Sequence, residues 1–516
     1  MDAHIHIESS MLTYTEFAKA VVKRGTTAVA SDLMEVTIVS GITGLKELLK
    51  EAQGTPVKLY YPVPSFMGED ETAFHTTGST LVPEMIEELL ALPEAVGIAE
   101  VLYPPILAES EASAHVLALA DARGKTAEGH APALTGDALN AYASAGIRSD
   151  HESTNREEAL AKLRAGLRVL IREGSASADL NAAIQIITQD GACARYVSLI
   201  SDDIDALHIK DCGHQDHKVR MAIAAGVTPM AAIRMVTINP AESLKIDRER
   251  GSIAPGKVAD MALLSSIEAC DVVKVISEGK LVVDGGALLT DIAAPAYAPE
   301  LLNTVKLSNP VKSEDLTISV ADAAATKAKV HVIGASGTSL LTDARTAELA
   351  IEGGVIQPDV SQDVLAIACV ERYGKHGGIG KSFIQGIGLT AGAIAISVGH
   401  DHHNITVVGT DYADMAAAVN RVAEIQGGLV YVKGGAVLSE IPLPVCGLLS
   451  PEDGDKVAEA LRAFIKTVGE NGCLLPSPNV TLSFITLIFI PKLAITDLGL
   501  FDVLQFKIID PVLETA

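Results

Sequence analysis

Short hydrophobic runs that end in a histidine or an acidic residue recur through the first half of the chain. The clearest four occupy residues 96–100, 125–130, 146–151 and 197–203. Each run is followed by residues with helical spacing of their apolar positions, as in 155–172. A strand followed by a helix, repeated over 1–245, predicts a (β/α)8 TIM-type barrel, whose chemistry lies at the carboxyl ends of the strands. The polar ends of these runs are therefore the candidate site residues.

A His-x-His pair, His4 and His6, lies at the very start of the predicted barrel. Side chains two residues apart in a strand project from the same face, so both imidazoles can reach one metal ion. Two histidines at this spacing also occur simply as the polar face of a half-exposed strand, and the pair alone leaves the choice open. The other polar strand ends favour the metal site.

Those strand ends supply Glu100, His130, His151 and Asp202. Glu100 closes an apolar strand, where a carboxylate is costly to bury unless it is paired or binds a metal. Taken singly, His130 and His151 are better explained as core histidines. Taken with the other ligand types at strand ends, they predict a cluster that suits Mn, Fe or Zn.

After residue 245 the helical spacing gives way to short β runs. Residues 246–290 predict a small β-domain, with strands over 261–264, 272–276 and 281–283. Residues 291–310 are expected to be a linker, and 311–516 a C-terminal α/β (α+β) domain. The most apolar segment, 482–490, is too short to span a bilayer and is interrupted by Pro491, so it predicts a buried strand or core helix.

Composition narrows the possible partners. The 516 residues include 48% hydrophobic positions, enough for large cores, and the net charge is −25. Such a charge argues against nucleic acid and against anionic membrane surfaces, both of which require basic patches. Six cysteines without a Cys-x-x-Cys pair, and no signal peptide before the first strand, favour a cytoplasmic location.

The chain resembles the adenine deaminase family of the amidohydrolase superfamily. The similar segments in the barrel are 2–12 (DAHIHIESSML), 128–132 (EGHAP), 149–152 (SDHE), 172–175 (REGS) and 213–214 (GH) with Arg220. Those beyond it are 254–260 (APGKVAD), 386–389 (GIGL), 400–404 (HDHHN), 442–444 (PLP) and 496–500 (TDLGL). The resemblance therefore covers nearly the whole chain.

The resemblance implies a binuclear centre of two divalent metal ions, with Mn²⁺ expected first and Fe²⁺ or Zn²⁺ as alternatives. His4, His6 and Asp202 would hold one ion, His130 and His151 the other, and Glu100 would bridge them. Two ions that share a hydroxide lower its pKa towards neutrality. The catalytic residues are then Glu100 and Asp202, the latter moving a proton from the hydroxide to the leaving ammonia.

Several further residues are candidates for the substrate pocket, each with a second interpretation. Glu8 is expected to orient a ligand imidazole if the first strand continues that far. Asp203 lies near the ligands or caps a helix, and His214 lines the pocket or lies at the surface. In the C-terminal unit, His400 and His402 are predicted to share one face after a strand over 393–398 and His403 the other. That cluster contacts the site, binds an extra ion, or is a polar loop.

The implied reaction is the hydrolytic deamination of adenine to hypoxanthine and ammonia, a step of purine salvage. Three departures from the family pattern concern the base pocket. Leu33 and Met34 stand where Pro-His is usual, Tyr103 replaces an expected asparagine, and His402 replaces the usual serine in the late histidine cluster. They favour an alternative substrate, either a modified 6-aminopurine or a cyclic amide. A non-catalytic purine-binding homologue is the third hypothesis.

Two expectations concern assembly. The resemblance implies a homo-oligomer, a dimer, that binds a small-molecule purine as the free base. It also implies β-strands before the His-x-His strand that complete the small β-domain. Because the chain begins at Met1 without them, we expect unpaired edges in that sheet.

Overall fold

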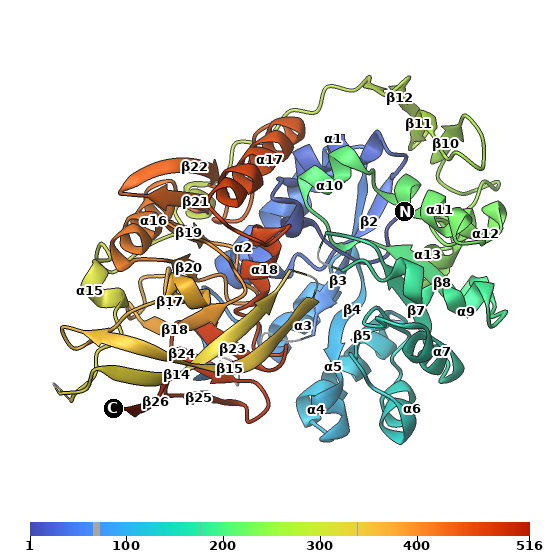
Figure 1. Cartoon of the computed structure of the whole chain (residues 1–516). Helices are drawn as coiled ribbons and strands as arrows, with labels where there is room; N and C mark the ends of the chain where they lie inside the picture. The colour runs from blue at the N-terminus through green and yellow to red at the C-terminus, as the bar shows by residue number, and fades with distance from the viewer. Residues whose placement is uncertain (66–72, 176, 323, 338) are drawn as a thin grey trace.

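The computed structural model describes residues 1–65, 73–175, 177–322, 324–337 and 339–516. Seven parallel strands follow one another in chain order, from β2 to β8, and curl into most of a barrel (Figure 1). The first strand closes the barrel, because Asp2 bridges Val29 on β2 while Ile5 pairs in parallel with Asp202 on β9. Since β9 directly continues β8, the predicted TIM-type barrel is confirmed.

The barrel strands are short, and helices follow them on the outside. The strands are β1 (Ile5–His6), β2 (Ala28–Ala30), β3 (Lys58–Pro64), β4 (Ala95–Leu102), β5 (Thr126–His130), β6 (Ser149–Asp150), β7 (Arg168–Arg172), β8 (Val197–Ile200) and β9 (Asp202–Asp203). The helices are α1 (Tyr14–Val22), α2 (Met34–Gln53), α3 (Pro83–Leu90), α4 (Tyr103–Leu107), α5 (Glu111–Ala122), α6 (Gly136–Ser144), α7 (Arg156–Arg164), α8 (Leu180–Ala183), α9 (Gln185–Thr188), α10 (Ala206–Asp211), α11 (Gln215–Ala224), α12 (Pro229–Arg234) and α13 (Ile238–Ser243).

Local chemistry sets where these elements begin and end. The Asn155 side chain accepts a hydrogen bond from the Glu158 N–H and so caps the start of α7. Gly166 adopts a left-handed φ of 94° just after that helix, which only glycine does easily. The stretch 155–172, expected to be helical throughout, is therefore a helix followed by the buried strand β7.

A small antiparallel sheet follows the barrel, as predicted. It consists of β10 (Met261–Leu264), β11 (Val272–Ser277), β12 (Lys280–Asp284) and β13 (Ala287–Leu288), paired in that order. Its members are only partly buried, apart from a few side chains such as Val275 and Val283. The boundaries at residues 246 and 290 stay predictions.

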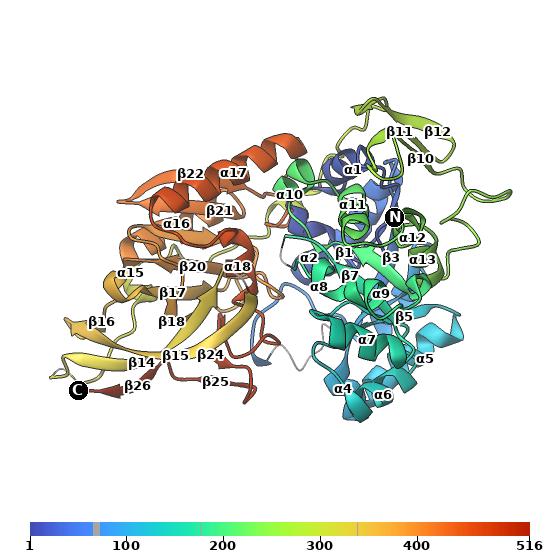
Figure 2. The ribbon, with the colours of Figure 1, turned by 45° about the vertical axis from the view of Figure 1, so that its right-hand side comes forward.

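The C-terminal unit is built on a ten-stranded sheet, visible to the left in Figures 1 and 2. Its order is β16-β15-β14-β18-β17-β20-β19-β21-β22, with β26 added to β14. The strands are β14 (Lys327–Ser336), β15 (Ser339–Glu352), β16 (Val355–Ile356), β17 (Val364–Val370), β18 (Ile379–Gln385), β19 (Ala393–Ile396), β20 (Ile405–Gly409), β21 (Gly428–Lys433), β22 (Ala436–Pro442) and β26 (Val512–Thr515). A second sheet has β23 (Leu493–Thr496), β24 (Gly499–Asp502) and β25 (Lys507–Ile509).

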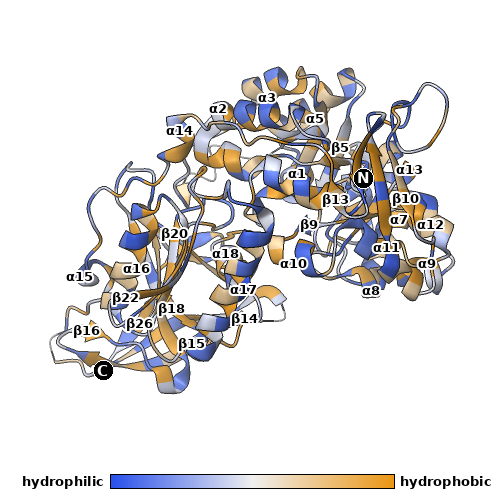
Figure 3. Ribbon diagram, turned by 90° about the horizontal axis from the view of Figure 1, so that it is seen from above, coloured by the Kyte–Doolittle hydropathy of each residue, from blue (hydrophilic) through white to orange (hydrophobic). Residues whose placement is uncertain are grey.

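Helices pack against this sheet and complete its core. They are α15 (Ser313–Leu316), α16 (Tyr412–Glu424), α17 (Gly454–Glu470) and α18 (Pro478–Phe484), whereas α14 (Pro299–Leu302) contacts α2 of the barrel. Figure 3 shows strand β20 mostly in the hydrophobic colour, whereas α17 carries both colours. The apolar segment 482–490 begins inside α18, where Leu482 is buried, so the core-helix interpretation holds there. Among the described residues, no helix has both the length and the apolar character needed to cross a membrane.

The barrel and the C-terminal unit meet along α10 and α17. Asp211 pairs with Arg462 at 2.7 Å, and Lys210 pairs with Glu459 at 2.7 Å. Helix α10 directly follows β9, the last barrel strand. The C-terminal unit is therefore fixed next to the carboxyl ends of the barrel strands.

Candidate metal centre

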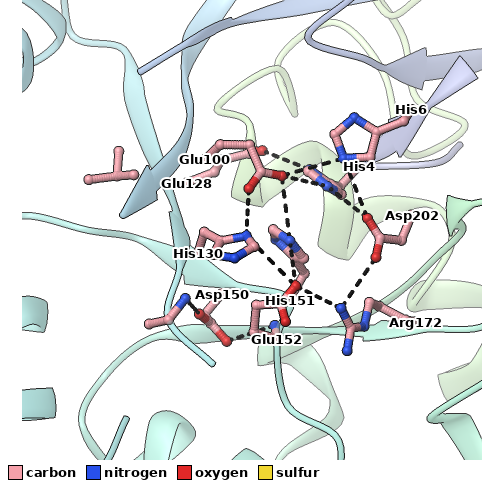
Figure 4. Close-up of polar contacts among 12 residues, drawn as sticks. His4, His6, Glu100, Glu128, His130, Asp150, His151, Glu152, Arg172 and Asp202 are labelled. Atoms are coloured by element: carbon pink, nitrogen blue, oxygen red, sulfur yellow. Dashed lines mark hydrogen bonds and ion pairs between the residues drawn. The ribbon is translucent and has the colours of Figure 1, made fainter. Parts of the chain in front are cut away.

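Glu100 is the centre of the cluster at the strand ends (Figure 4). One carboxylate oxygen, Oε1, lies 3.2 Å from Nε2 of His4 and 3.5 Å from Nε2 of both His6 and His151. The other, Oε2, lies 2.7 Å from Nδ1 of His130. A single carboxylate from β4 thus reaches one histidine just before β1, one in β1, one at the end of β5 and one after β6. The structure brings these sequence-predicted residues together.

Asp202 completes the cluster from the opposite side. Its Oδ1 lies 3.3 Å from Nε2 of His4 and 3.6 Å from Nε2 of His6. Asp202 and Glu100 both adopt left-handed backbone, with φ of 57° and 55°, a conformation that carboxylate side chains rarely take. At Glu100 the register between β4 and β5 also shifts, and such a bulge re-aims a side chain. The backbone is strained where it points these two carboxylates inward.

The chemistry of these groups fits metal ions. Ligand atoms of three overlapping trios lie within 4.8 Å of one another: His4, His6 and Glu100; His4, His151 and Asp202; Glu100, His130 and His151. His4 Nε2, Glu100 Oε1 and His130 Nδ1 are buried without a hydrogen-bond partner among the described residues. Buried lone pairs without donors are costly, and imidazole and carboxylate together suit Mn, Fe or Zn. The residues present therefore fit divalent metal ions.

The electrostatics of the cluster also require positive charge. Burial favours neutral His4, yet the nearby carboxylates of Asp202 and Glu100 hold its pKa well above the usual value. Burial likewise opposes ionisation of Glu100, but the His151 and His130 charges hold its pKa well below the usual value. The pocket thus stabilises either protons on the histidines or cations in their place.

Two carboxylates lie behind the rings of His6 and His4. Asp32 Oδ1 lies 3.3 Å from Nδ1 of His6, and Glu128 Oε2 lies 3.8 Å from Nδ1 of His4. A metal-bound histidine usually donates its second N–H to such a group. We expected this role for Glu8 if the first strand continued that far. The strand ends at His6, and Glu8 lies in a 3-10 helix where it accepts a hydrogen bond from the Val36 N–H.

Two polar residues at the cluster carried no role in the sequence analysis. Arg172 at the end of β7 places Nη1 2.7 Å from Glu152 and 3.3 Å from Asp202. Glu152 also lies 3.1 Å from Nε2 of His151. Burial opposes the charge on Asp202, but the neighbouring histidines and Arg172 hold its pKa below the usual range. Glu152 lies in segment 149–152 and Arg172 in segment 172–175. Their position at the ends of predicted strands could have indicated that they belong to the site.

A small cavity separates the strand ends from the C-terminal unit. Its lining includes Glu8, Ser9, Asp203, His400, Ser483 and Phe484. The Ser9 hydroxyl donates to Asp203, and burial, together with the Asp202 charge, raises the pKa of Asp203. Burial and the charges of Glu35 and Asp32 raise the pKa of Glu8 to about 8. Glu8, Asp203 and His400 thus line one cavity, as expected of pocket residues, although their roles stay predictions.

The histidine cluster of the C-terminal unit differs from the predicted alternation. Strand β19 ends at Ile396, and the histidines lie in a turn rather than on an extended strand. His400 and His403 therefore point to the same partner, Glu35, with His400 Nδ1 3.0 Å from Glu35 Oε1. His402 faces His75 instead, with ring centroids 5.2 Å apart. Glu35, His400 and His403 form a further buried trio with ligand atoms close enough for a cation.

His214 lies elsewhere. Its Nδ1 is 2.8 Å from the Thr26 hydroxyl, and its Nε2 is 3.1 Å from the Ser201 hydroxyl and 3.3 Å from Asp2. The ring is fully buried and packs edge-on to Phe17 of α1. Both ring nitrogens are engaged by the protein, so the structure gives the expected pocket role of His214 no support.

The altered positions lie beside the cluster. Leu33 and Met34 are buried at the start of α2, between Asp32 and Glu35. Tyr103 begins α4, directly after β4, and packs against the main hydrophobic core. These side chains change the surroundings of the site and leave all six proposed ligands in place.

The chain matches known protein families in both of its large parts. Residues 1–282 match the model of the amidohydrolase family, so the chain belongs to that family of hydrolases. Residues 339–507 match the adenine deaminase C-terminal domain. Adenine deaminase of Desulforamulus reducens is 37% identical over 515 residues, covering 100% of this chain and 87% of that protein.

Two further relatives agree. Adenine deaminase of Moorella thermoacetica is 38% identical over 513 residues, covering 99% of this chain and 86% of that protein. Adenine deaminase of Brucella anthropi is 39% identical over 514 residues, covering 99% and 88%. Within the amidohydrolases, the chain therefore belongs to the adenine deaminase family.

Proposed function

We propose that the protein catalyses the hydrolytic deamination of adenine to hypoxanthine and ammonia. The observation that carries the proposal is the convergence of four histidines, Glu100 and Asp202 at the strand ends of an amidohydrolase barrel. The match of residues 339–507 to the adenine deaminase C-terminal domain supports the purine as substrate. The protein would act in purine salvage.

The proposed cofactor is a pair of divalent ions, manganese first, with iron or zinc as alternatives. His4, His6 and Asp202 would hold one ion, His130 and His151 the other, with Glu100 between them. Such ions, when bound, supply the Lewis acidity that activates water at neutral pH. Asp32 lies 3.3 Å from Nδ1 of His6, and Glu128 lies 3.8 Å from Nδ1 of His4, where each carboxylate would accept the second ring N–H of a metal-bound histidine.

Asp202 transfers the protons of the reaction, and Arg172 supports it. In the overall reaction a C–O bond forms at the ring carbon, the C–N bond to the exocyclic amine breaks, and one water is consumed. Asp202 starts as a carboxylate, because the histidines and Arg172 stabilise its charge, and it accepts the proton that water loses. The same carboxyl then delivers that proton to the departing ammonia. Arg172 positions Asp202 for both transfers.

Two finer parts of the proposal concern the cell and the assembly. A cytoplasmic location is favoured by the cysteines, which are unpaired at all six positions. A homodimer stays a prediction, and light scattering of the purified protein tests it.

The test is ammonia release from adenine by purified, manganese-loaded protein, with His151→Ala prepared in parallel. We expect turnover in the parent protein and its loss in the variant, with equal folding shown by circular dichroism. N6-methyladenine and a cyclic amide are assayed beside adenine, because Leu33 and Met34 replace the usual Pro-His. Turnover of one of these without turnover of adenine would reassign the substrate. A metal-loaded protein that binds adenine but turns over none of the three would be a non-catalytic homologue.

A further inference from the structure

A second group of metal-ligating side chains lies on the outside of the barrel, on α10 and α11. His208 is on α10, Cys212 ends that helix, and His217 is on α11. One ligand atom from each lies within 4.8 Å of the other two, and the two imidazole centroids are 5.8 Å apart. The strand-end centre uses none of these residues, and no sulfur atom belongs to that centre.

The turn between the two helices is built to hold these positions. The Asp205 side chain accepts a hydrogen bond from the His208 N–H at 2.7 Å and so caps α10. Gly213 follows Cys212 with a φ of 117°, and a Cβ there would meet the Asp216 carboxylate at 2.6 Å. Only glycine fits this turn, which places Cys212 and His217 beside His208.

His208 has a ring nitrogen that nothing else uses. Its Nε2 is buried and has no hydrogen-bond partner among the described residues. The nearby cations are engaged elsewhere, since Arg220 pairs with Asp216 at 3.0 Å and Lys218 donates to the Ser201 hydroxyl at 2.9 Å. A buried polar atom without a partner is costly, and a bound cation would satisfy it.

We propose that His208, Cys212 and His217 bind one zinc ion. Two imidazoles and a thiolate form a soft donor set that favours zinc over magnesium, calcium or manganese. On binding, the Cys212 thiol loses its proton to solvent, and the thiolate and two neutral imidazoles donate to the ion. All three residues are partly exposed, so water can take the fourth tetrahedral position.

The site lies where it would stiffen the joint between the two units. Helix α10 follows Asp202 and Asp203, and its Asp211 pairs with Arg462 of α17. An ion that ties α10 to α11 would hold the segment between the strand-end centre and the C-terminal unit.

Cobalt(II) tests the proposal independently of any deaminase activity. It replaces zinc in such sites, and a cysteine thiolate bound to it gives a near-ultraviolet charge-transfer band that imidazole and carboxylate ligands do not. The full-length protein, with its strand-end centre first filled with manganese, is titrated with cobalt(II). We expect this band to grow to saturation with one equivalent in the parent protein and to disappear when zinc is added.

Variants show whether the charge-transfer band comes from cobalt bound to Cys212. Cys212→Ser should abolish it, whereas Cys193→Ser, which alters an exposed cysteine elsewhere, should leave it unchanged. His217→Gln should weaken cobalt binding by about tenfold or more. The cobalt affinity of this variant tests the proposed site even if Cys212→Ser does not fold. No band in the parent protein at excess cobalt, a band that survives Cys212→Ser, or unchanged affinity in His217→Gln would overturn the proposal.

Discussion

Lys162 pairs with Asp150 at the end of β6, directly before His151, and its removal should destabilise the protein strongly. The side chain is 0% exposed and lies 2.5 Å from Asp150 Oδ1 and 2.9 Å from Glu158 Oε1. Asp150 is also fully buried, and it accepts hydrogen bonds from the Ala131 and Glu152 N–H groups. The lysine is thus the cation that compensates a buried carboxylate next to a proposed metal ligand.

The size of the effect follows from this burial. Lys162→Met keeps the aliphatic stem but leaves Asp150 charged and unpaired in the interior, which costs about 3–5 kcal/mol. For a unit of this size each kcal/mol lowers Tm by about 2–4 °C, so the expected fall is about 6–20 °C. Lys46→Met removes a lysine from the exposed pair with Glu88, where both side chains are at least half exposed, and should cost about 0–1 kcal/mol.

Calorimetry and urea unfolding of both variants beside the parent protein provide the comparison. Lys162→Met should melt well below Lys46→Met and should bind manganese less tightly, since Asp150 directly precedes His151. Equal melting temperatures for the two variants would refute the reasoning, because they would show that Asp150 tolerates the loss of its cation.

Three further predictions concern other contacts. Asp32→Asn, which weakens the group behind His6, should lower manganese affinity about 10–100-fold in a metal titration; unchanged affinity would contradict that role. Burial lowers the pKa of His75 to about 4, so the unfolded chain takes up the proton first and stability is lost as pH falls from about 6.5 to 4. Between pH 7 and 5, the free energy of unfolding of the parent protein, measured with urea, should fall by about 2 kcal/mol more than that of His75→Phe. Equal falls would show that His75 does not cause this pH dependence. A double-mutant cycle with Glu35→Gln and His400→Gln should give a coupling of about 0.5–3 kcal/mol, whereas additive effects would show that the contact does not join the units.

The sequence predicted the cluster well because the barrel constrains it. Glu100, His130 and Asp202 each end a hydrophobic run, and the fold gathers strand ends at one rim. Residue type and position at strand ends were therefore enough to predict that these side chains lie together. The small sheet after the barrel also followed from the short β runs over 261–264, 272–276 and 281–283.

Contacts between distant segments were not predictable in the same way. Glu35 reaches His400 across 365 residues, and nothing in either local pattern indicates the other. The histidine turn was expected as an alternating strand, because the apolar run before it does not show where pairing stops. His214 was assigned to the pocket from its motif alone, although its partners are Thr26 and Ser201. In each case tertiary packing decides which face a side chain takes.

The most direct test of the account is an activity titration of metal-stripped protein with manganese, with adenine as substrate and hypoxanthine as the measured product. The account predicts that the rate rises with added metal and levels off at two equivalents per chain, and that Glu100→Gln shows neither the break nor the activity. Full activity without metal, or undiminished hypoxanthine formation by Glu100→Gln, would contradict the proposal that these six side chains hold the catalytic centre.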